Sequence, residues 1–203
     1  PLLVQYRNGN LAVAHNGNLT NAKALREELV NEGAIFQTTT DTEVILHLIA
    51  RSKLDNQTEQ IKEALSQLEG AYCVLILTDD KLVVARDPNG FRPLAIGKKN
   101  GTFVVASETC AFDIIQAKYL RDVKPGEIIV IDDEAILTSE LKTDTIPNKI
   151  TNRKHCIFEF IYFSRPDSKI FNHNVDKIRR RLGKILARNH PVIDKDGEKV
   201  IVI

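Results

Sequence analysis

Two apolar segments in the middle of the sequence restrict the fold most. Residues 72–77 (Y-C-V-L-I-L) and 82–85 (L-V-V-A) are rich in strand-forming residues, and Asp79-Asp80 between them predicts an antiparallel hairpin. A sheet with one face open to water alternates apolar and polar side chains, and these segments do not alternate. We therefore expect an α+β fold in which two sheets pack on each other with helices outside both, a four-layer αββα sandwich.

Apolar spacing elsewhere predicts the other elements. We expect strands at 10–15, 94–97, 103–106 and 127–131, an Asn-Gly turn after the first of them, and helices starting near 20 and near 40 and covering 57–68 and 109–117. The polar stretch 141–154, broken by Pro147, predicts a linker between a domain at 1–150 and a second unit at 151–203. There, Asn174 is expected to cap a basic helix whose apolar residues 175, 178, 182, 185 and 186 point inward. A final strand at 200–203 would make this the opening of an α/β unit.

Composition excludes several classes of function. The formal net charge of +1 gives no support for a nucleic-acid partner or a membrane surface, and no apolar run approaches the roughly 20 residues that span a bilayer. The sequence has 3 cysteines that lie far apart, which argues against a disulfide framework and for a cytoplasmic location. The sequence begins and ends within strand-like segments and contains no Met, so we expect a piece of a longer protein.

Asn16-Gly17, in the tetrapeptide His15-Asn16-Gly17-Asn18, is a candidate oxyanion hole. A side-chain amide and a backbone N–H aimed at one oxygen stabilise the tetrahedral intermediate of amide hydrolysis. The alternative is a tight turn, for which Asn-Gly is the most common dipeptide.

Asp41 stands at a predicted helix start, where it would bind the ammonium of an amino-acid substrate, cap the helix, or do both. The loop 87–94 (D-P-N-G-F-R-P-L) is interpreted as architectural, with Arg92 as a buried partner for an acid such as Asp87. Ser107-Glu108-Thr109 would cap a helix or line a pocket.

The cysteines are weak candidates for a nucleophile. Cys73 lies in an apolar strand and is expected in the core. Cys110 begins an apolar helix, where packing is the simpler interpretation. Cys156 has no second cysteine near it in the sequence, so spacing alone does not make it a metal ligand.

Taken together, the motifs resemble the amidophosphoribosyltransferase family, also called glutamine phosphoribosylpyrophosphate amidotransferases, within the class II glutamine amidotransferases. They cover nearly all of the 203 residues. In order they are A-H-N-G-N-L (14–19), T-D-T-E-V (40–44), E-G-A-Y (69–72), D-P-N-G-F-R-P-L (87–94), V-A-S-E-T-C-A-F-D (105–113), K-P-G-E (124–127) and F-I-Y-F-S-R-P-D-S (160–168).

The resemblance implies an N-terminal-nucleophile (Ntn) hydrolase type of glutaminase domain followed by the start of a phosphoribosyltransferase domain. It implies that Asn16 and Gly17 form the oxyanion hole, that Asp41 holds the α-amino group of glutamine, and that Cys156 is one ligand of a [4Fe–4S] cluster. The parent enzyme would hydrolyse glutamine at an N-terminal Cys and pass ammonia to phosphoribosylpyrophosphate, giving 5-phosphoribosylamine in the first step of purine (IMP) biosynthesis. A Mg²⁺ ion in the transferase domain and a homo-oligomeric assembly are expected as well.

The sequence departs from the family pattern at its first residue. Residue 1 is Pro, and neither the nucleophilic Cys, nor the arginine segment that grips the glutamine carboxylate, nor the acidic pyrophosphate-binding motif occurs in these residues. We therefore expect no hydrolysis by the chain alone. Two alternatives stay open: a glucosamine-6-phosphate synthase-like glutaminase domain, which shares the first motifs but not S-R-P-D-S, and a glutaminase-like module without catalytic activity.

Overall fold

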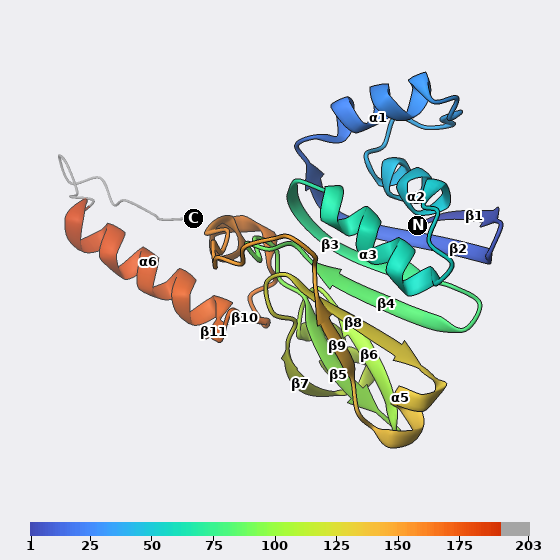
Figure 1. Ribbon diagram of the computed structural model, residues 1–203. Helices are drawn as coiled ribbons and strands as arrows, with labels where there is room; N and C mark the ends of the chain where they lie inside the picture. Colours follow the sequence, from blue (N-terminus) through green and yellow to red (C-terminus); the bar gives the residue numbers. More distant parts are fainter. Residues whose placement is uncertain (192–203) are drawn as a thin grey trace.

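A computed structural model describes residues 1–191 of the chain. Its largest element is a six-stranded antiparallel sheet (Figure 1). In spatial order the strands are β1 (Leu2–Tyr6), β2 (Gly9–Leu19), β3 (Gly70–Leu77), β4 (Lys81–Arg86), β8 (Glu127–Asp132) and β9 (Lys142–Thr145). A smaller antiparallel sheet has the order β6 (Thr102–Ala106), β5 (Ala95–Lys99) and β7 (Lys118–Asp122).

Helices cover one face of the large sheet, and the small sheet covers the other (Figure 1). The covering helices are α1 (Ala22–Asn31), α2 (Thr42–Arg51) and α3 (Gln57–Gln67). Val83 of β4 packs into the helix-side core, whereas its neighbour Val84 packs into the core between the sheets. Successive residues of one strand thus face two apolar cores, which is the reason that the sequence does not alternate.

The outer face of the small sheet carries the short helix α4 (Cys110–Ile115). Gly97 of β5 lies against the buried ring of Phe112, while Ile96 next to it points into the core between the sheets. The order of layers is therefore helices, large sheet, small sheet and α4, as the sequence predicts. The fourth layer is thin, because α4 has only six residues.

Four further elements were not predicted from the sequence. The predicted linker begins with β9, which pairs with β8; its residues Lys-Thr-Asp-Thr are all exposed, so an edge strand here carries no apolar signal. Strand β7 and the short helix α5 (Asp133–Thr138) were not predicted. The aromatic segment 158–163 (F-E-F-I-Y-F), for which the sequence predicts no element, forms a single π-helical turn, η1 (Glu159–Phe163).

The second unit holds a short hairpin, β10 (Lys169–Ile170) with β11 (His173–Asn174), and helix α6 (Val175–Asn189), which extends away from the sheets (Figure 1). The Asn174 side chain accepts a hydrogen bond from the Lys177 N–H, which confirms the predicted cap. The expected inward packing of α6 is wrong beyond its first turns, because Leu182, Ile185 and Leu186 are exposed in the described part of the chain. The final strand predicted at 200–203 lies outside the described residues.

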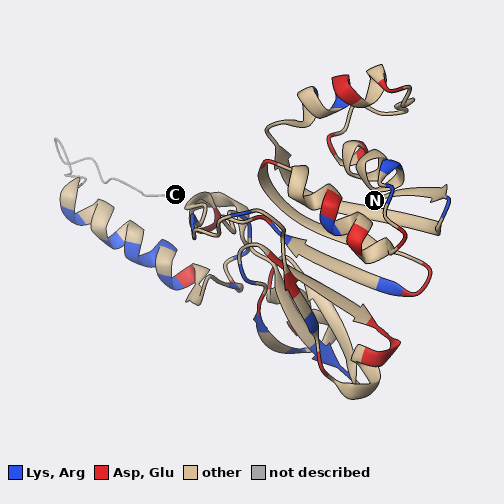
Figure 2. Cartoon of the chain, in the orientation of Figure 1, with Lys and Arg blue, Asp and Glu red and all other residues tan. Residues whose placement is uncertain are grey.

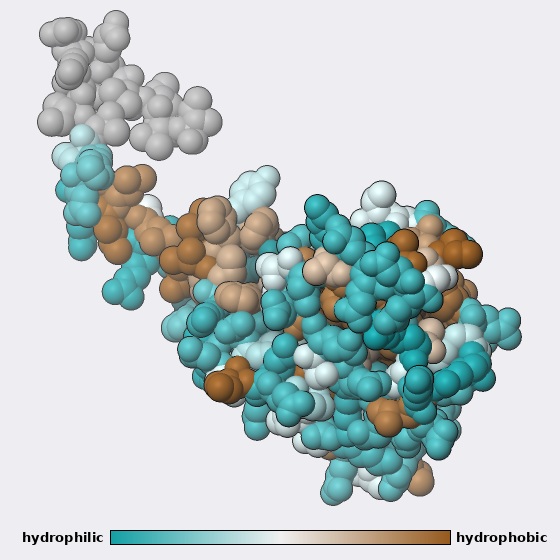
Figure 3. Space-filling view, turned by 45° about the horizontal axis from the view of Figure 1, so that its top comes forward, coloured by the Kyte–Doolittle hydropathy of each residue, from teal (hydrophilic) through white to brown (hydrophobic). Residues whose placement is uncertain are grey.

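The surface of α6 is divided by polarity. Lysine and arginine positions recur along the helix, blue in Figure 2, and apolar residues gather along it and along the adjoining segment (Figure 3). The exposed apolar residues of these two segments are Ile157, Phe158, Ile161, Tyr162, Phe163, Leu182, Ile185 and Leu186.

Candidate active site

The tetrapeptide His15–Asn18 lies inside strand β2 and not in a turn. Strand β2 pairs with β3 as far as Leu19, and Gly17 stands opposite Tyr72. The turn interpretation is therefore wrong, since an Asn-Gly turn requires the chain to reverse between two strands and β2 continues through this dipeptide.

Asp41 links the start of α2 to this strand. Its Oδ2 accepts a hydrogen bond of 3.0 Å from the Leu19 backbone N–H, and its Oδ1 lies 3.5 Å from Nδ1 of the buried His15 ring. The side chain makes no capping hydrogen bond to α2, although Asp41 occupies the cap position. Of the two roles expected for Asp41, helix capping is wrong, and the carboxylate instead holds the helix start against β2.

The backbone of β2 presents an uncovered edge at Gly17. Strand β1 pairs with β2 only as far as Val13, so beyond that residue no described strand covers this edge. Backbone N–H groups alternate between the two edges of a strand, and the N–H of Leu19 points away from β3, toward Asp41. The N–H of Gly17, two residues earlier, consequently points toward the same side as Asp41.

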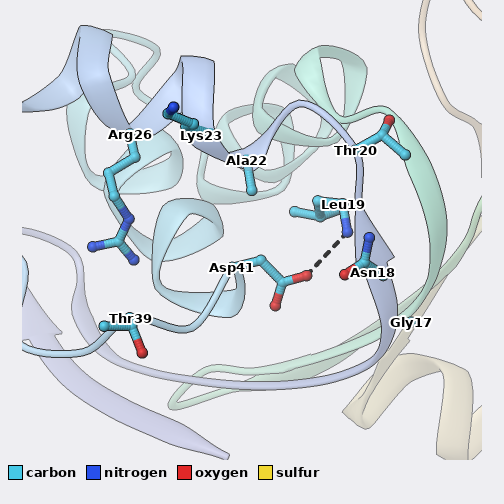
Figure 4. Close-up of a pocket in the computed structure, with 9 residues that line it drawn as sticks. All are labelled: Gly17, Asn18, Leu19, Thr20, Ala22, Lys23, Arg26, Thr39 and Asp41. Carbon is cyan, nitrogen blue, oxygen red and sulfur yellow. Dashed lines mark hydrogen bonds between the residues drawn. The ribbon is translucent and has the colours of Figure 1, made fainter.

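Gly17 and Asp41 share a cavity of about 600 Å³ (Figure 4). Arg26 of α1 also borders it and donates hydrogen bonds of 2.9 Å to the carbonyl oxygens of Thr38 and Thr40, which fixes the loop that carries Asp41. Its role was missed from the sequence, where α1 reads as an ordinary surface helix. The other residues that line the cavity are Asn18, Leu19, Thr20, Ala22, Lys23 and Thr39.

Asn16 does not line that cavity. Its side-chain amide lies between two polar groups: Oδ1 accepts a hydrogen bond of 3.0 Å from Arg92 Nη2, and Nδ2 donates one of 3.3 Å to Ser107 Oγ. Arg92 and Gly17 line a neighbouring cavity of about 450 Å³, together with Cys156. Gly17 thus lines both cavities. Arg92, which lines the second cavity, donates the hydrogen bond that holds the Asn16 amide.

Arg92 is not the partner of Asp87. The buried Asp87 carboxylate accepts hydrogen bonds from the backbone N–H groups of Tyr72, Asn89 and Phe91. Burial raises the pKa of Asp87, against the opposing effect of these N–H groups. Asp87 therefore shapes the loop through its backbone, as an architectural residue does, whereas Arg92 Nη1 lies 3.3 Å from Oε1 of Glu159.

The cysteines do not form a metal centre by themselves. Cys73 is buried, its Sγ donates to the Pro93 carbonyl oxygen, and burial raises the pKa of its thiol to about 12. Cys110 is buried as well, and Cys156 is half-buried. Among residues 1–191, no group of three or more His, Cys, Asp or Glu side chains is arranged to hold a metal ion. Cys156 alone does not make a cluster site, so no chemical step is assigned to a cluster.

None of the helices within residues 1–191 has both the length and the apolar character needed to cross a membrane.

Comparisons with known proteins show the family of the chain. A family model described as a glutamine amidotransferase domain matches residues 1–113, more than half of the chain. The amidophosphoribosyltransferase of Bacillus subtilis (strain 168) is 52% identical over 193 residues, which are 95% of this chain and 39% of that protein. The chloroplastic amidophosphoribosyltransferase of Vigna aconitifolia is 49% identical over 193 residues, covering 95% of this chain and 38% of the relative.

A solved structure extends the similarity to three dimensions. The glutamine phosphoribosylpyrophosphate amidotransferase from B. subtilis, complexed with ADP and GMP, superposes with a TM-score of 0.88 at 52% identity and covers 95% of this chain and 41% of that one. The chain thus spans less than half the length of the relatives it matches. On these matches, the chain belongs to the glutamine amidotransferase domain family and is similar to the amidophosphoribosyltransferases within it.

Proposed function

We propose that this chain supplies the oxyanion-stabilising and substrate-holding groups of an amidophosphoribosyltransferase. The observation that carries the proposal is the shared cavity, in which the N–H edge of Gly17 and the Asp41 carboxylate face the same space. A backbone donor beside a carboxylate suits an α-amino acid with a side-chain amide, because the carboxylate attracts the α-ammonium while the donor stabilises charge that develops on the amide oxygen.

Asn16 supplies the second donor in this proposal. Its Nδ2 carries two hydrogens, and Ser107 Oγ accepts only one of them. In this proposal the other hydrogen is the one that would bind the oxyanion, although in the described residues the Asn16 side chain lines neither of the two cavities that Gly17 borders. By similarity to the amidophosphoribosyltransferases, the nucleophile in this proposal would be an N-terminal cysteine of the longer protein. Cys73 and Cys110 are buried and do not line the cavity that Gly17 and Asp41 share.

The longer protein would use water to convert glutamine to glutamate and ammonia. The ammonia would then displace pyrophosphate from phosphoribosylpyrophosphate and give 5-phosphoribosylamine. Residues 151–203 begin the phosphoribosyltransferase domain in this proposal, and Mg²⁺ would bind within that domain. Cys156 would be one ligand of a [4Fe–4S] cluster whose other ligands come from elsewhere in the protein. A homo-oligomer and a cytoplasmic location belong to the same proposal.

The test uses the full-length protein that contains this chain. Glutamate release from glutamine and pyrophosphate release from phosphoribosylpyrophosphate are measured with glutamine or with ammonium as the nitrogen donor. We expect Asn16→Ala to lower kcat with glutamine roughly 10²- to 10³-fold. Activity with ammonium should be unchanged, because that reaction bypasses the glutaminase site.

Each alternative predicts a different result. A glucosamine-6-phosphate synthase-like enzyme would consume fructose 6-phosphate and leave phosphoribosylpyrophosphate intact. A module without catalytic activity would release no glutamate, and either result would overturn the proposal.

A further inference from the structure

A chain of contacts connects the segment after residue 150 to the Asn16 amide. Arg92 stands at its centre: Nη2 donates to Asn16 Oδ1 at 3.0 Å, and Nη1 lies 3.3 Å from Oε1 of Glu159 in η1. The guanidinium group also lies 4.6 Å from the ring centroid of Phe163, at the end of the same π-helical turn. One side chain therefore contacts both the candidate oxyanion hole and the second unit.

Arginine fixes which way the amide points. A guanidinium group only donates hydrogen bonds, so the atom of Asn16 that faces it must be the carbonyl oxygen. The Nδ2 group is consequently turned to the opposite side, where one hydrogen reaches Ser107 Oγ. Without Arg92 the amide is free to rotate by a half-turn, which would point its oxygen at a developing oxyanion and repel it.

Glu159 holds Arg92 in this position. The Glu159 side chain is buried, and its Oε2 accepts a hydrogen bond of 2.6 Å from Ser164 Oγ. A buried carboxylate requires a charged or hydrogen-bonded partner, and here Arg92 and Ser164 take the two oxygens. The position of the guanidinium group is thus set by the second unit and not by the glutaminase sheets alone.

The other end of the amide is tied to the same segment. Ser107, which accepts from Asn16 Nδ2, precedes Glu108 in the chain. The Glu108 carboxylate accepts hydrogen bonds from the backbone N–H of Arg165 at 2.8 Å and from Ser168 Oγ at 2.7 Å. Arg92 therefore contacts the 159–168 segment directly, and Ser107 is connected to it through Glu108, the next residue in the chain.

We infer that Arg92 and Glu159 are positioning residues for the Asn16 amide, and that the 159–168 segment sets the orientation of the oxyanion hole through them. The inference rests on the proposed role of Asn16. It makes the rate of glutamine cleavage depend on how the second unit is seated, with no contact between Glu159 and the substrate.

The experiment uses the full-length protein with Arg92→Lys and Glu159→Gln, each alone and in an Asn16→Ala background. Lysine keeps the charge but cannot contact Asn16 and Glu159 at the same time with a planar group. We expect Arg92→Lys to lower kcat for glutamine about 10-fold or more, with KM unchanged, because the oxyanion forms only in the transition state. Glu159→Gln should lower kcat less, because this substitution weakens the contact that holds Arg92 but leaves Arg92 in place.

The Asn16→Ala background separates positioning from general damage to the fold. If Arg92 acts through Asn16, neither substitution lowers kcat further once the amide is gone, and the effects are non-additive. Ammonium-dependent activity should be unchanged in every variant, which reports an intact transferase site, and an unchanged urea midpoint reports that the glutaminase domain is folded. Matched controls are Arg180→Lys on α6 and Glu134→Gln on α5, both in exposed ion pairs; neither should alter kcat.

The outcomes are distinct. An unchanged kcat in both Arg92→Lys and Glu159→Gln, or the same loss with and without the Asn16 amide, overturns the positioning inference. An unchanged kcat in Asn16→Ala by itself overturns the proposed function first. If Arg92→Lys loses ammonium-dependent activity, the near-isosteric Glu159→Gln decides the matter alone, by its effect on kcat and by its additivity with Asn16→Ala.

Discussion

The Asp41 carboxylate accepts a hydrogen bond from the backbone N–H of Leu19, a residue on the strand that carries Asn16 and Gly17. This contact ties the start of α2 to the uncovered edge of β2. It uses one carboxylate oxygen, and the other lies near the His15 ring. The acid that would hold the substrate therefore also fixes the distance between the two sides of the cavity.

Asp41→Asn tests this double role. The amide oxygen of Asn can still accept from Leu19, so the fold should persist, but the negative charge that attracts an α-ammonium is lost. A hydrogen bond to a charged group contributes about 1.5–3 kcal/mol, so we expect KM for glutamine to rise roughly 10- to 100-fold. Steady-state kinetics of the full-length protein measure the change. Asp55→Asn, at an exposed position, is the control, and an unaltered KM in Asp41→Asn would exclude the binding role.

Gly17→Ala tests the close packing of β2 on β3. A Cβ at this position would overlap the Ala71 carbonyl oxygen and lie 2.9 Å from Nε2 of the His15 ring. Backbone cannot move aside cheaply, so we expect the free energy of unfolding to fall by about 1–3 kcal/mol or more in urea denaturation at pH 7. Gly183→Ala in α6 is the control: nothing lies within 4 Å of its added Cβ. It should increase stability by about 0.5–1 kcal/mol. Equal stabilities for Gly17→Ala and the wild type would contradict the packing.

The ionised Glu43 carboxylate should stabilise the fold at neutral pH, and we expect this stabilisation to be lost in acid. Its buried carboxylate accepts hydrogen bonds from the backbone N–H groups of Gln37 and Thr38 and from the Thr38 hydroxyl. Burial alone would raise its pKa, but these bonds outweigh burial and lower the pKa below its ordinary value of 4.5. A group with a lowered folded-state pKa stabilises the fold at pH values above its unfolded pKa, and this contribution is lost as pH falls through the folded pKa.

The measurement is the urea midpoint of the protein between pH 7 and pH 3. We expect Glu43→Gln to be less stable by about 1.5–3 kcal/mol at pH 7, because the substitution weakens bonds to a charged acceptor. The difference between the two proteins should shrink below pH 4.5, where the wild-type carboxylate begins to bind its proton. A constant difference across this range would show that the charge of Glu43 does not stabilise the loop.

The cysteines should differ in reactivity. Burial raises the pKa of the Cys73 thiol to about 12, and only the thiolate is nucleophilic. We expect iodoacetamide at pH 8 to leave Cys73 and Cys110 unmodified in the native protein, and to modify the half-buried Cys156 when no cluster is bound to it. All three should react in urea, and mass spectrometry of peptides identifies the sites. Rapid native labelling of Cys73 would contradict the buried position.

The layers of this fold can be predicted from the sequence because a strand that faces two apolar cores has apolar residues at successive positions. Val83 and Val84 are adjacent, and each faces a different apolar layer, so the strand loses its alternation. Strand β9 has no such run of apolar residues, since it lies at a sheet edge with both faces exposed. Helix α6 misleads for the opposite reason: its apolar residues indicate burial, but within the described residues nothing covers Leu186.

The candidate site was predicted only as separate residues. Local preference favours a turn at Asn16-Gly17 and a cap at Asp41, and in both places a tertiary contact overrides it. The bond between Arg92 and Asn16 joins residues that are 76 positions apart, so no sequence spacing reveals it. The loop motif around Arg92 signals a constrained turn, and the choice of Glu159 over Asp87 as its ionic partner becomes visible only in three dimensions.

The continuity of β2 through Gly17 restricts how the position of the backbone donor at Gly17 can change. A donor on a flexible loop can be withdrawn by a small rearrangement, but withdrawing this one would break the ladder of bonds between two central strands. Adjustments that spare the fold must therefore act on side chains, the Asn16 carboxamide and the charged groups around it, while the peptide unit of Gly17 stays in place.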